Sequence, residues 1–333
     1  MKRLSALLTI AALILGQASP TLAYLKFGVP VNGKQVTLKW AQTPVHYFIS
    51  TAVVPGVTGT DFQSTIAKAF ATWEAVPTAS ISYQLAGVTA ASPGQDDGSS
   101  VLGFKSRPDL DRVLASTSFL VDSSTGALIE SDIFFNAAFP WSVAAAGEAS
   151  KFDLESIALH EIGHFSGLGH SALGETELQS GGGRRVLSAE AVMFPIAFAP
   201  GSITARTLKA DDIAGISDLY PDGTFTATSG SVSGSVTKNG VALFGAHVVA
   251  FNAATGLMVG GFTLNTQGQF SIGGLSPGVH VVRVEPVDDA DVASFFDSSQ
   301  TVDVDFLVAF LDRVVVVPKG GDSGQVAFTV VKK

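Results

Sequence analysis

The sequence predicts two folded regions: an α+β domain with a mixed, twisted sheet and a histidine-bearing helix, followed by a small all-β sandwich. Up to about residue 222, strand and helix patterns follow one another, whereas from about residue 227 short strands and glycine turns continue without a helix between them. Of the 333 residues, 46% are hydrophobic and 15% are charged, so a sizeable core can be buried. We therefore expect domains at residues 24–226 and 227–333.

Periodicity locates the elements of the first region. Apolar residues that alternate with polar ones predict strands, and apolar residues three or four positions apart predict helices. The expected strands are 36–50, broken at Thr43-Pro44, then 81–85, 113–121 and 128–136. The expected helices are 61–74, capped by Thr60 or Asp61, then 152–165 and 209–219. Polar loops are expected at 92–100 and 175–185, the second with three consecutive glycines.

The second region begins after a linker of threonine, serine and glycine at 224–230. Its expected strands are 233–236, 245–251, 260–264, 269–272, 279–284, 302–317 and 326–331. Short strands at this spacing, joined by glycine turns, are typical of an all-β sandwich.

The most specific feature of the chain is the stretch from His160 to His170, which reads H-E-x-x-H-x-x-G-x-x-H. On a helix, residues four positions apart leave the same face, so His160 and His164 can meet at one metal ion. Gly167 adopts a positive φ at little cost, which ends the helix and lets His170 return as a third ligand.

This motif predicts a catalytic metal centre with one zinc ion. Three histidine ligands leave a tetrahedral zinc one position for water, and Glu161 lies next to the first histidine, where it can accept a proton from that water. A carboxylate from Glu175 or Glu177 is an alternative third ligand, but the spacing of the motif favours His170.

The motif resembles that of the metzincin metalloproteases, and two further features make the chain similar to the matrixin family. Met193, 23 residues after His170, resembles the methionine of the Met-turn, and residues 208–220 resemble the C-terminal matrixin helix. The resemblance covers roughly residues 33–222, including 133–136 and Trp141. It implies a zinc metalloendopeptidase in which His160, His164 and His170 bind zinc and Glu161 is the general base. Met193 would support the site without being a ligand.

The second region resembles the carboxypeptidase regulatory-like sandwiches at residues 232–236 and 266–278. This resemblance implies a fold more than an activity, with a glycan or a protein as the ligand of the sandwich. His247 and His280 lie in strand-like segments, where we expect core or surface histidines rather than metal ligands.

The N-terminus has the pattern of a secretory signal peptide at residues 1–23. Lys2 and Arg3 precede an apolar run at 4–15, and the small-residue cleavage pattern 21–23 follows. We therefore expect a secreted protein, extracellular or periplasmic, without a membrane anchor. The chain has no cysteine, and without Lys2 and Arg3 it keeps 18 basic side chains against 29 acidic ones, a net charge of −11. This charge argues against nucleic acid as a partner and leaves a protein or peptide substrate.

The chain departs from the matrixin pattern in two ways. No histidine occurs between His46 and His160, so a second, structural zinc is not expected, and a set of aspartates either supplies oxygen ligands for calcium or forms a solvated loop. These aspartates are Asp96, Asp97, Asp109, Asp111 and Asp122. Without a cysteine there is no thiol to keep the enzyme latent, so no proteolytic activation is expected.

Two further expectations concern the substrate and the class of function. An extended substrate would lie along an edge strand near residues 128–134. The alternative function is a secreted binding or adhesion protein that uses a catalytically weak metzincin scaffold and recognises its ligand through the sandwich.

Overall fold

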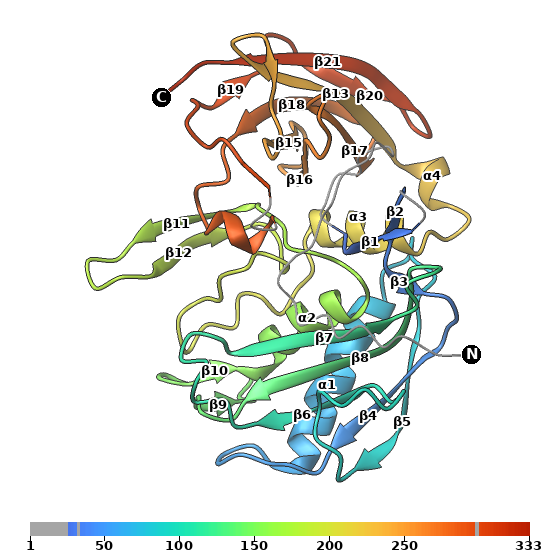
Figure 1. Ribbon diagram of the computed structural model, residues 1–333, viewed down its shortest axis with the longest axis vertical. Coiled ribbons are helices and arrows are strands. Elements are labelled where there is room, and N and C mark those ends of the chain that lie inside the picture. Colours follow the sequence, from blue (N-terminus) through green and yellow to red (C-terminus); the bar gives the residue numbers. More distant parts are fainter. Residues whose placement is uncertain (1–25, 32–33, 297–299) are drawn as a thin grey trace.

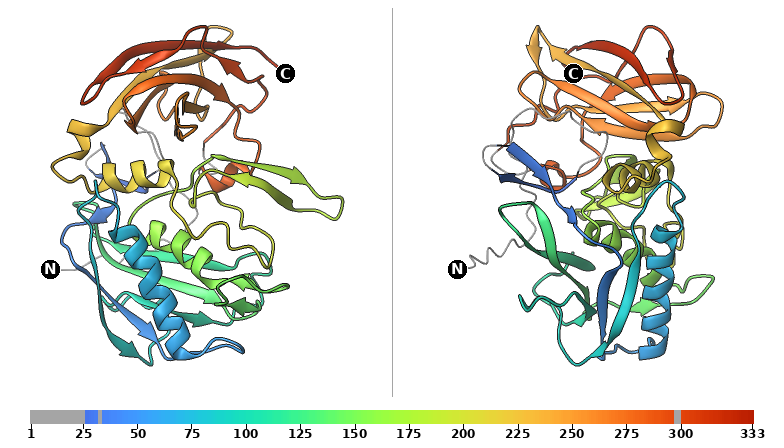
Figure 2. Two further views of the ribbon diagram at one scale, coloured as in Figure 1. Left: turned by 180° about the vertical axis from the view of Figure 1, so that it is seen from behind. Right: turned by 90° about the vertical axis from the view of Figure 1, so that its right-hand side faces the viewer.

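The computed structural model describes residues 26–31, 34–296 and 300–333. The expected signal peptide at 1–23 lies outside these residues. Figures 1 and 2 show two halves stacked along the long axis: strands and two long helices below, and two sheets above. None of the described helices is long and apolar enough to cross a membrane. The chain is a mixed α/β structure with several sheets and few helices.

A mixed, six-stranded sheet forms the lower half. Its order is β3-β8-β6-β4-β5, with β7 paired antiparallel to β8 and the other pairs parallel. The strands are β3 (Lys39–Trp40), β4 (Val45–Ser50), β5 (Tyr83–Thr89), β6 (Val101–Lys105), β7 (Ala115–Val121) and β8 (Ala127–Asn136). Helices α1 (Gly59–Glu74) and α2 (Leu154–Phe165) cover one face of it, and the packed residues form the largest core cluster.

Helix α1 follows its apolar pattern but starts earlier than expected. Phe62, Ile66 and Trp73 are completely buried, which confirms the predicted face. The cap is Thr58 rather than Thr60 or Asp61: its hydroxyl accepts a hydrogen bond from the Asp61 amide at 3.1 Å, and the Asp61 carboxylate accepts one from the Thr58 amide. The helix therefore begins with a capping box.

Strand β6 has no counterpart among the expected elements. It pairs with β4 on one side and β8 on the other, and its residues are buried on both faces of the sheet, so its sequence does not alternate. The expectation that residues 128–134 form an edge strand is wrong. They belong to β8, which pairs on both sides, while β7 forms the edge of the sheet on that side and pairs only with β8 among the described strands.

Two segments expected to be irregular are ordered elements. The predicted polar loop at 175–185 is a hairpin of β11 (Gly174–Leu178) and β12 (Arg184–Ala189), which projects from the molecule (Figure 1). Its turn uses Gly182 and Gly183 with φ of 86° and 83°. The predicted linker contains the short helix α4 (Phe225–Thr228), which follows α3 (Ala210–Leu219).

The upper half, which we call the C-terminal β region (residues 230–330), contains two sheets. One has the order β14-β13-β17 with β21 on β13, and the other has the order β16-β15-β18-β19 with β20 on β18. Side chains from both sheets, such as Val232 and Val282, share one core cluster, and Ala214 of α3 belongs to the same cluster. The strands are β13 (Gly230–Lys238), β14 (Val241–Ala242), β15 (His247–Asn252), β16 (Met258–Phe262), β17 (Gln269–Leu275), β18 (Gly278–Glu285), β19 (Ala309–Phe310), β20 (Val315–Val317) and β21 (Asp322–Val330).

The expected strands of this region are thus present, except that 302–317 holds only the short strands β19 and β20. A 3₁₀ turn, η1 (Val292–Ser294), lies between β18 and β19 and reaches down to the lower half (Figure 1). The remaining short strands are β1 (Gly28–Val31), β2 (Lys34–Thr37), β9 (Trp141–Ser142) and β10 (Phe152–Asp153).

Candidate metal centre

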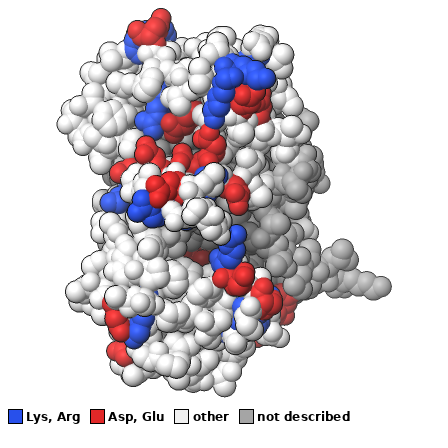
Figure 3. Space-filling model, turned by 90° about the vertical axis from the view of Figure 1, so that its left-hand side faces the viewer, with Lys and Arg blue, Asp and Glu red and all other residues white. Residues whose placement is uncertain are grey.

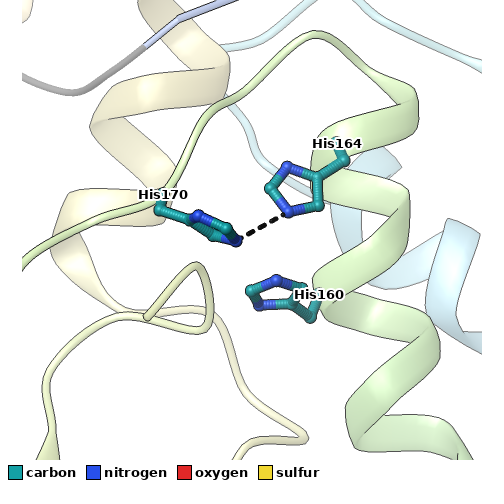
Figure 4. A group of neighbouring side chains, drawn as sticks. All are labelled: His160, His164 and His170. Atoms are coloured by element: carbon teal, nitrogen blue, oxygen red, sulfur yellow. Dashed lines mark hydrogen bonds between the residues drawn. The ribbon is translucent and has the colours of Figure 1, made fainter. Parts of the chain in front are cut away.

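Helix α2 carries the first two histidines of the motif and the glutamate. Asp153 caps the helix by accepting a hydrogen bond from the Ser156 amide at 2.9 Å, and it is paired with Arg206 in a largely buried ion pair. Along the helix, the four-residue spacing turns His160 and His164 to the same side, as expected from the motif (Figure 4).

Gly167 ends the helix and reverses the chain toward the third histidine. Its φ is +103°, and a Cβ atom there would collide with the carbonyl oxygen of Leu38. The chain returns so that the ligand nitrogens of His160, His164 and His170 all lie within 4.8 Å of one another (Figure 4). The structure therefore brings together the three histidines that the motif singled out.

Each of the three imidazoles is oriented by a backbone carbonyl. The Nδ1 atoms lie 2.8 Å from the Val192 oxygen for His160, 2.8 Å from the Leu168 oxygen for His164, and 2.6 Å from the Ser294 oxygen for His170. Because a carbonyl oxygen only accepts, each Nδ1 must carry the proton, which leaves each Nε2 with a free lone pair.

This arrangement fits a metal cation. The Nε2 atoms of His164 and His170 are 3.1 Å apart, and with both protons on Nδ1 their lone pairs repel unless a cation lies between them. Two nitrogens on a tetrahedral zinc at about 2.0–2.1 Å are separated by ~3.3 Å, close to this distance. Burial lowers the pKa of all three histidines, that of His160 to about 3, so the rings stay neutral as ligands must be.

Glu161 lies beside this group in a buried position. Its Oε2 accepts a hydrogen bond from the Thr117 hydroxyl at 2.6 Å, and burial raises the pKa of its carboxyl to about 7. Thr117 lies on the edge strand β7 and is 1% exposed. Thr117 was not among the predicted site residues, since its only signal in the sequence is a polar residue at an inward-facing strand position.

A turn beneath the histidines contains Met193. Asp212 of α3 accepts hydrogen bonds from the amides of Val192 and Met193 at 2.8 and 3.1 Å and so fixes the turn whose carbonyl orients His160. Burial raises the pKa of the Asp212 carboxyl to about 6. A Cβ atom on Gly163 would lie 3.0 Å from Met193 Cε and closer still to its sulfur, so the turn packs against α2 only because residue 163 is glycine. Asp212 too was missed as a site residue.

A cavity of about 380 Å³ opens over the histidines. It is lined by the segment 112–117, which includes the start of β7, by the segment 194–199, and by His160, Glu161 and His170. Apart from Arg112 and Asp153, the side chains around this group are uncharged.

The other candidate ligands do not join this group. Glu175 is exposed and Glu177 is paired with Arg185 on the hairpin, so neither lies among the ligand nitrogens. Of the candidate calcium ligands, Asp97 and Asp122 accept hydrogen bonds from nearby amides, and Asp109 is paired with Arg107. Calcium binding stays an untested prediction. His247 and His280 are both 1% exposed within strands, as expected for core histidines.

Comparison with known proteins points to one class of enzyme. Residues 39–180 match the family model for matrixin. The chain is 43% identical over 75 residues to metalloendoproteinase 1 of Glycine max, covering 21% of this chain and 18% of that protein. It is 29% identical over 201 residues to metalloendoproteinase 1-MMP of Arabidopsis thaliana, covering 57% of this chain and 45% of that protein. The chain thus spans less than half the length of each relative.

Together with the three-histidine group, these matches support a matrixin-like metalloprotease. The family match ends at residue 180, before Met193 and before α3. Among solved structures, the Bacillus anthracis TIE protein matches 32% of this chain at 14% identity with a TM-score of 0.22. The chain covers 17% of that protein, and this score is too low to bear on the fold.

Proposed function

We propose that the protein is a secreted, zinc-dependent endopeptidase. The observation that carries this proposal is the meeting of three neutral imidazoles, each with Nε2 free of a proton, beside the buried carboxyl of Glu161 at the base of a cavity. A single zinc ion would be held by His160, His164 and His170. Met193 would support the site from below without binding the metal.

In this mechanism Glu161 is the general base and later the general acid. A bound zinc ion would supply Lewis acidity, which polarises the scissile carbonyl and makes a water molecule more acidic. Glu161 accepts the proton of the attacking water and delivers it to the leaving amine. The Thr117 hydroxyl holds the carboxylate in place, since it donates to Oε2 at 2.6 Å.

The substrate would be a peptide in extended conformation. The edge strand β7 forms one wall of the cavity and has no partner on its outer side among the described strands, so its backbone can pair with a peptide. The lining of the cavity also includes Phe194, Ile196 and Phe198, which suit an apolar substrate side chain.

The proposal also covers the secretion of the protein and the division of the chain into domains. Residues 1–23 would be a signal peptide, residues 24–226 the protease domain and residues 227–333 a β-sandwich of the carboxypeptidase regulatory-like kind. The shared core of its two sheets supports a sandwich. This region would recognise a protein or a glycan, and no cysteine is present to impose latency on the zinc.

The test is a substitution that removes the base and keeps the metal ligands. In Glu161→Gln, the amide oxygen still accepts from Thr117 but cannot take up a proton, so casein hydrolysis should fall by about 10²–10⁴-fold while the zinc content stays at one per chain. Glu74→Gln, at the exposed end of α1, is the matched control and should be fully active. Near wild-type proteolysis by Glu161→Gln would rule out the mechanism.

A secreted binding protein with a weak catalytic scaffold is the alternative. It predicts that the wild-type protein, loaded with zinc, degrades neither casein nor gelatin above the level left after chelation. Hydrolysis that a zinc chelator abolishes and added zinc restores would exclude this alternative.

A further inference from the structure

The third histidine of the metal centre is oriented by a residue of the C-terminal β region. His160 and His164 rest on carbonyls of Val192 and Leu168, which lie within 32 residues of them in sequence. His170 instead donates from Nδ1 to the carbonyl of Ser294, 124 positions further along the chain, at 2.6 Å. Ser294 belongs to the turn η1, which the C-terminal β region sends down to the lower half (Figure 1).

We propose that the C-terminal β region is a working part of the metal centre, because its η1 turn sets the tautomer and the direction of the His170 imidazole. The inference rests on the metal site of the proposed function, but not on peptide hydrolysis. Without the Ser294 carbonyl, His170 would have no fixed proton on Nδ1, and its Nε2 lone pair would not be directed at the metal position in advance.

Aromatic packing fixes the position of the Ser294 carbonyl. Phe295 and Phe296 follow directly and are each 1% exposed, in a cluster with Phe262 of β16 and with Ala172, two residues after His170. The Phe295 ring lies 6.5 Å from the His170 ring, edge to face, and 5.9 Å from the Phe262 ring. Phe295 therefore bridges the third histidine and the C-terminal sheet.

Hydrogen bonds tie the segment after His170 to the same region. The amide and hydroxyl of Thr176 donate to the side chain and the carbonyl of Asp289 at 2.9 and 2.6 Å. Further along the contact, the buried Asp211 of α3 accepts a hydrogen bond from the Gly260 amide of β16 at 2.8 Å. Charged side chains gather at the level where the two halves meet (Figure 3).

The two halves pack closely against each other, so separating them would disturb the segment after His170. A Cβ atom on Gly260 would lie 2.5 Å from His247 Nε2 and 3.3 Å from Leu173 Cγ. Leu173 forms a small buried cluster with Ala191 and Val249 of β15, and Ala214 of α3 belongs to the core of the C-terminal β region. The contact is thus a shared core rather than a flexible linkage.

The test compares two phenylalanine truncations in the full chain by zinc affinity, measured by competition with a chelator. Phe295→Ala removes the ring that braces Ser294 and His170, and the dissociation constant for zinc should rise about tenfold, in the range found when an outer partner of a ligand is lost. Phe328→Ala is the control, since Phe328 is buried in the same region but packs on Phe270 in the other cluster. It should lower the unfolding temperature and leave zinc affinity within about twofold of wild type.

A second pair of variants tests the shared core without deleting a ring. Gly260→Ala introduces a methyl group where His247 and Leu173 already lie, and it should weaken zinc binding, whereas Gly273→Ala, which meets nothing within 4 Å, should not. Cobalt substituted for zinc gives a further readout: its visible absorption should change in Phe295→Ala and stay constant in Phe328→Ala.

Wild-type zinc affinity and an unchanged cobalt spectrum in folded Phe295→Ala would overturn the proposal, as would equal losses of affinity in Phe295→Ala and Phe328→Ala. If Phe295→Ala does not fold, the tautomer of His170 in the metal-free wild type decides. ¹⁵N NMR with labelled histidine should find the proton on Nδ1, and a proton on Nε2 would refute the inference. A protein that binds zinc as expected but cleaves nothing would contradict the proposed function alone.

Discussion

The fit between Gly163 and Met193 gives a quantitative test of how α2 and the turn beneath it support the metal centre. In Gly163→Ala, the new methyl group would lie 3.0 Å from Met193 Cε and from Trp73 Cζ2, and closer still to the Met193 sulfur. Alanine stabilises an exposed helix by about 1 kcal/mol over glycine, but inserting a methyl group into a packed core costs about 1–3 kcal/mol. We expect the crowding to outweigh the gain in helix stability, so Gly163→Ala should lower the free energy of unfolding by about 1 kcal/mol.

Removing the Met193 side chain should relieve most of the loss of stability caused by Gly163→Ala. Met193→Ala alone creates a cavity and costs about 2–5 kcal/mol, but in that background the methyl group added by Gly163→Ala no longer meets the sulfur, and only the Trp73 contact at 3.0 Å remains. The double-mutant cycle, measured by urea unfolding in the presence of a chelator, should give a favourable coupling of about 1–3 kcal/mol. Additive losses within about 0.5 kcal/mol would refute the idea that the turn packs on α2 through this pair.

Two other predictions follow from buried polar groups at the site. In Thr117→Val the hydroxyl that donates to Glu161 is lost, which should lower kcat by about 10–100-fold, the equivalent of one hydrogen bond to a charged group, with zinc content unchanged. Thr72→Val, at a half-buried position of α1 away from the cavity, is the control, and equal activity of both variants would exclude the role of Thr117. Burial raises the pKa of the Asp211 carboxyl from 3.8 to about 7, so between these pH values the folded protein holds a proton that the unfolded chain has lost. Wild type should therefore lose stability relative to Asp211→Asn as pH rises from 4 to 7, by on the order of 4 kcal/mol at 1.36 kcal/mol per pKa unit, and a difference in unfolding temperature that does not change with pH would contradict this.

Local spacing explains which parts of the site could be predicted from the sequence. The four-residue interval between His160 and His164 and the positive φ of Gly167 are short-range properties, and the structure reproduces both. The helices α1, α2 and α3 were found because each has an apolar stripe against the core. The ends of the helices were predicted less accurately. The cap of α1 is Thr58, because the backbone geometry determines which of several neighbouring polar residues caps a helix.

The missed features depend on contacts between distant segments. Strand β6 was missed because burial on both faces removes the alternation that marks a strand. The sequence of β11 and β12 predicts a polar loop because this hairpin projects from the molecule and its two strands pair with each other. Thr117 and Asp212 are common residue types whose role appears only when β7 and α3 are brought next to α2.

Ser294 shows most clearly which part of the site cannot be predicted from the sequence. It contributes its backbone carbonyl and not its side chain, and because every residue has a backbone carbonyl, no residue type marks this role. The motif states which three imidazoles can bind the metal, but the direction of each ring depends on the acceptor behind it. One acceptor, Leu168, lies within the motif, and Val192 lies 22 residues after it, whereas Ser294 comes from a region that the sequence alone presents as a separate domain. Because that acceptor is held by Phe295 and by the core shared across Gly260 and Leu173, zinc bound at the site should stabilise the C-terminal β region as well as α2. Zinc should accordingly protect the amides of β15 and β16 from hydrogen exchange as well as those of α2, although neither strand contains a ligand.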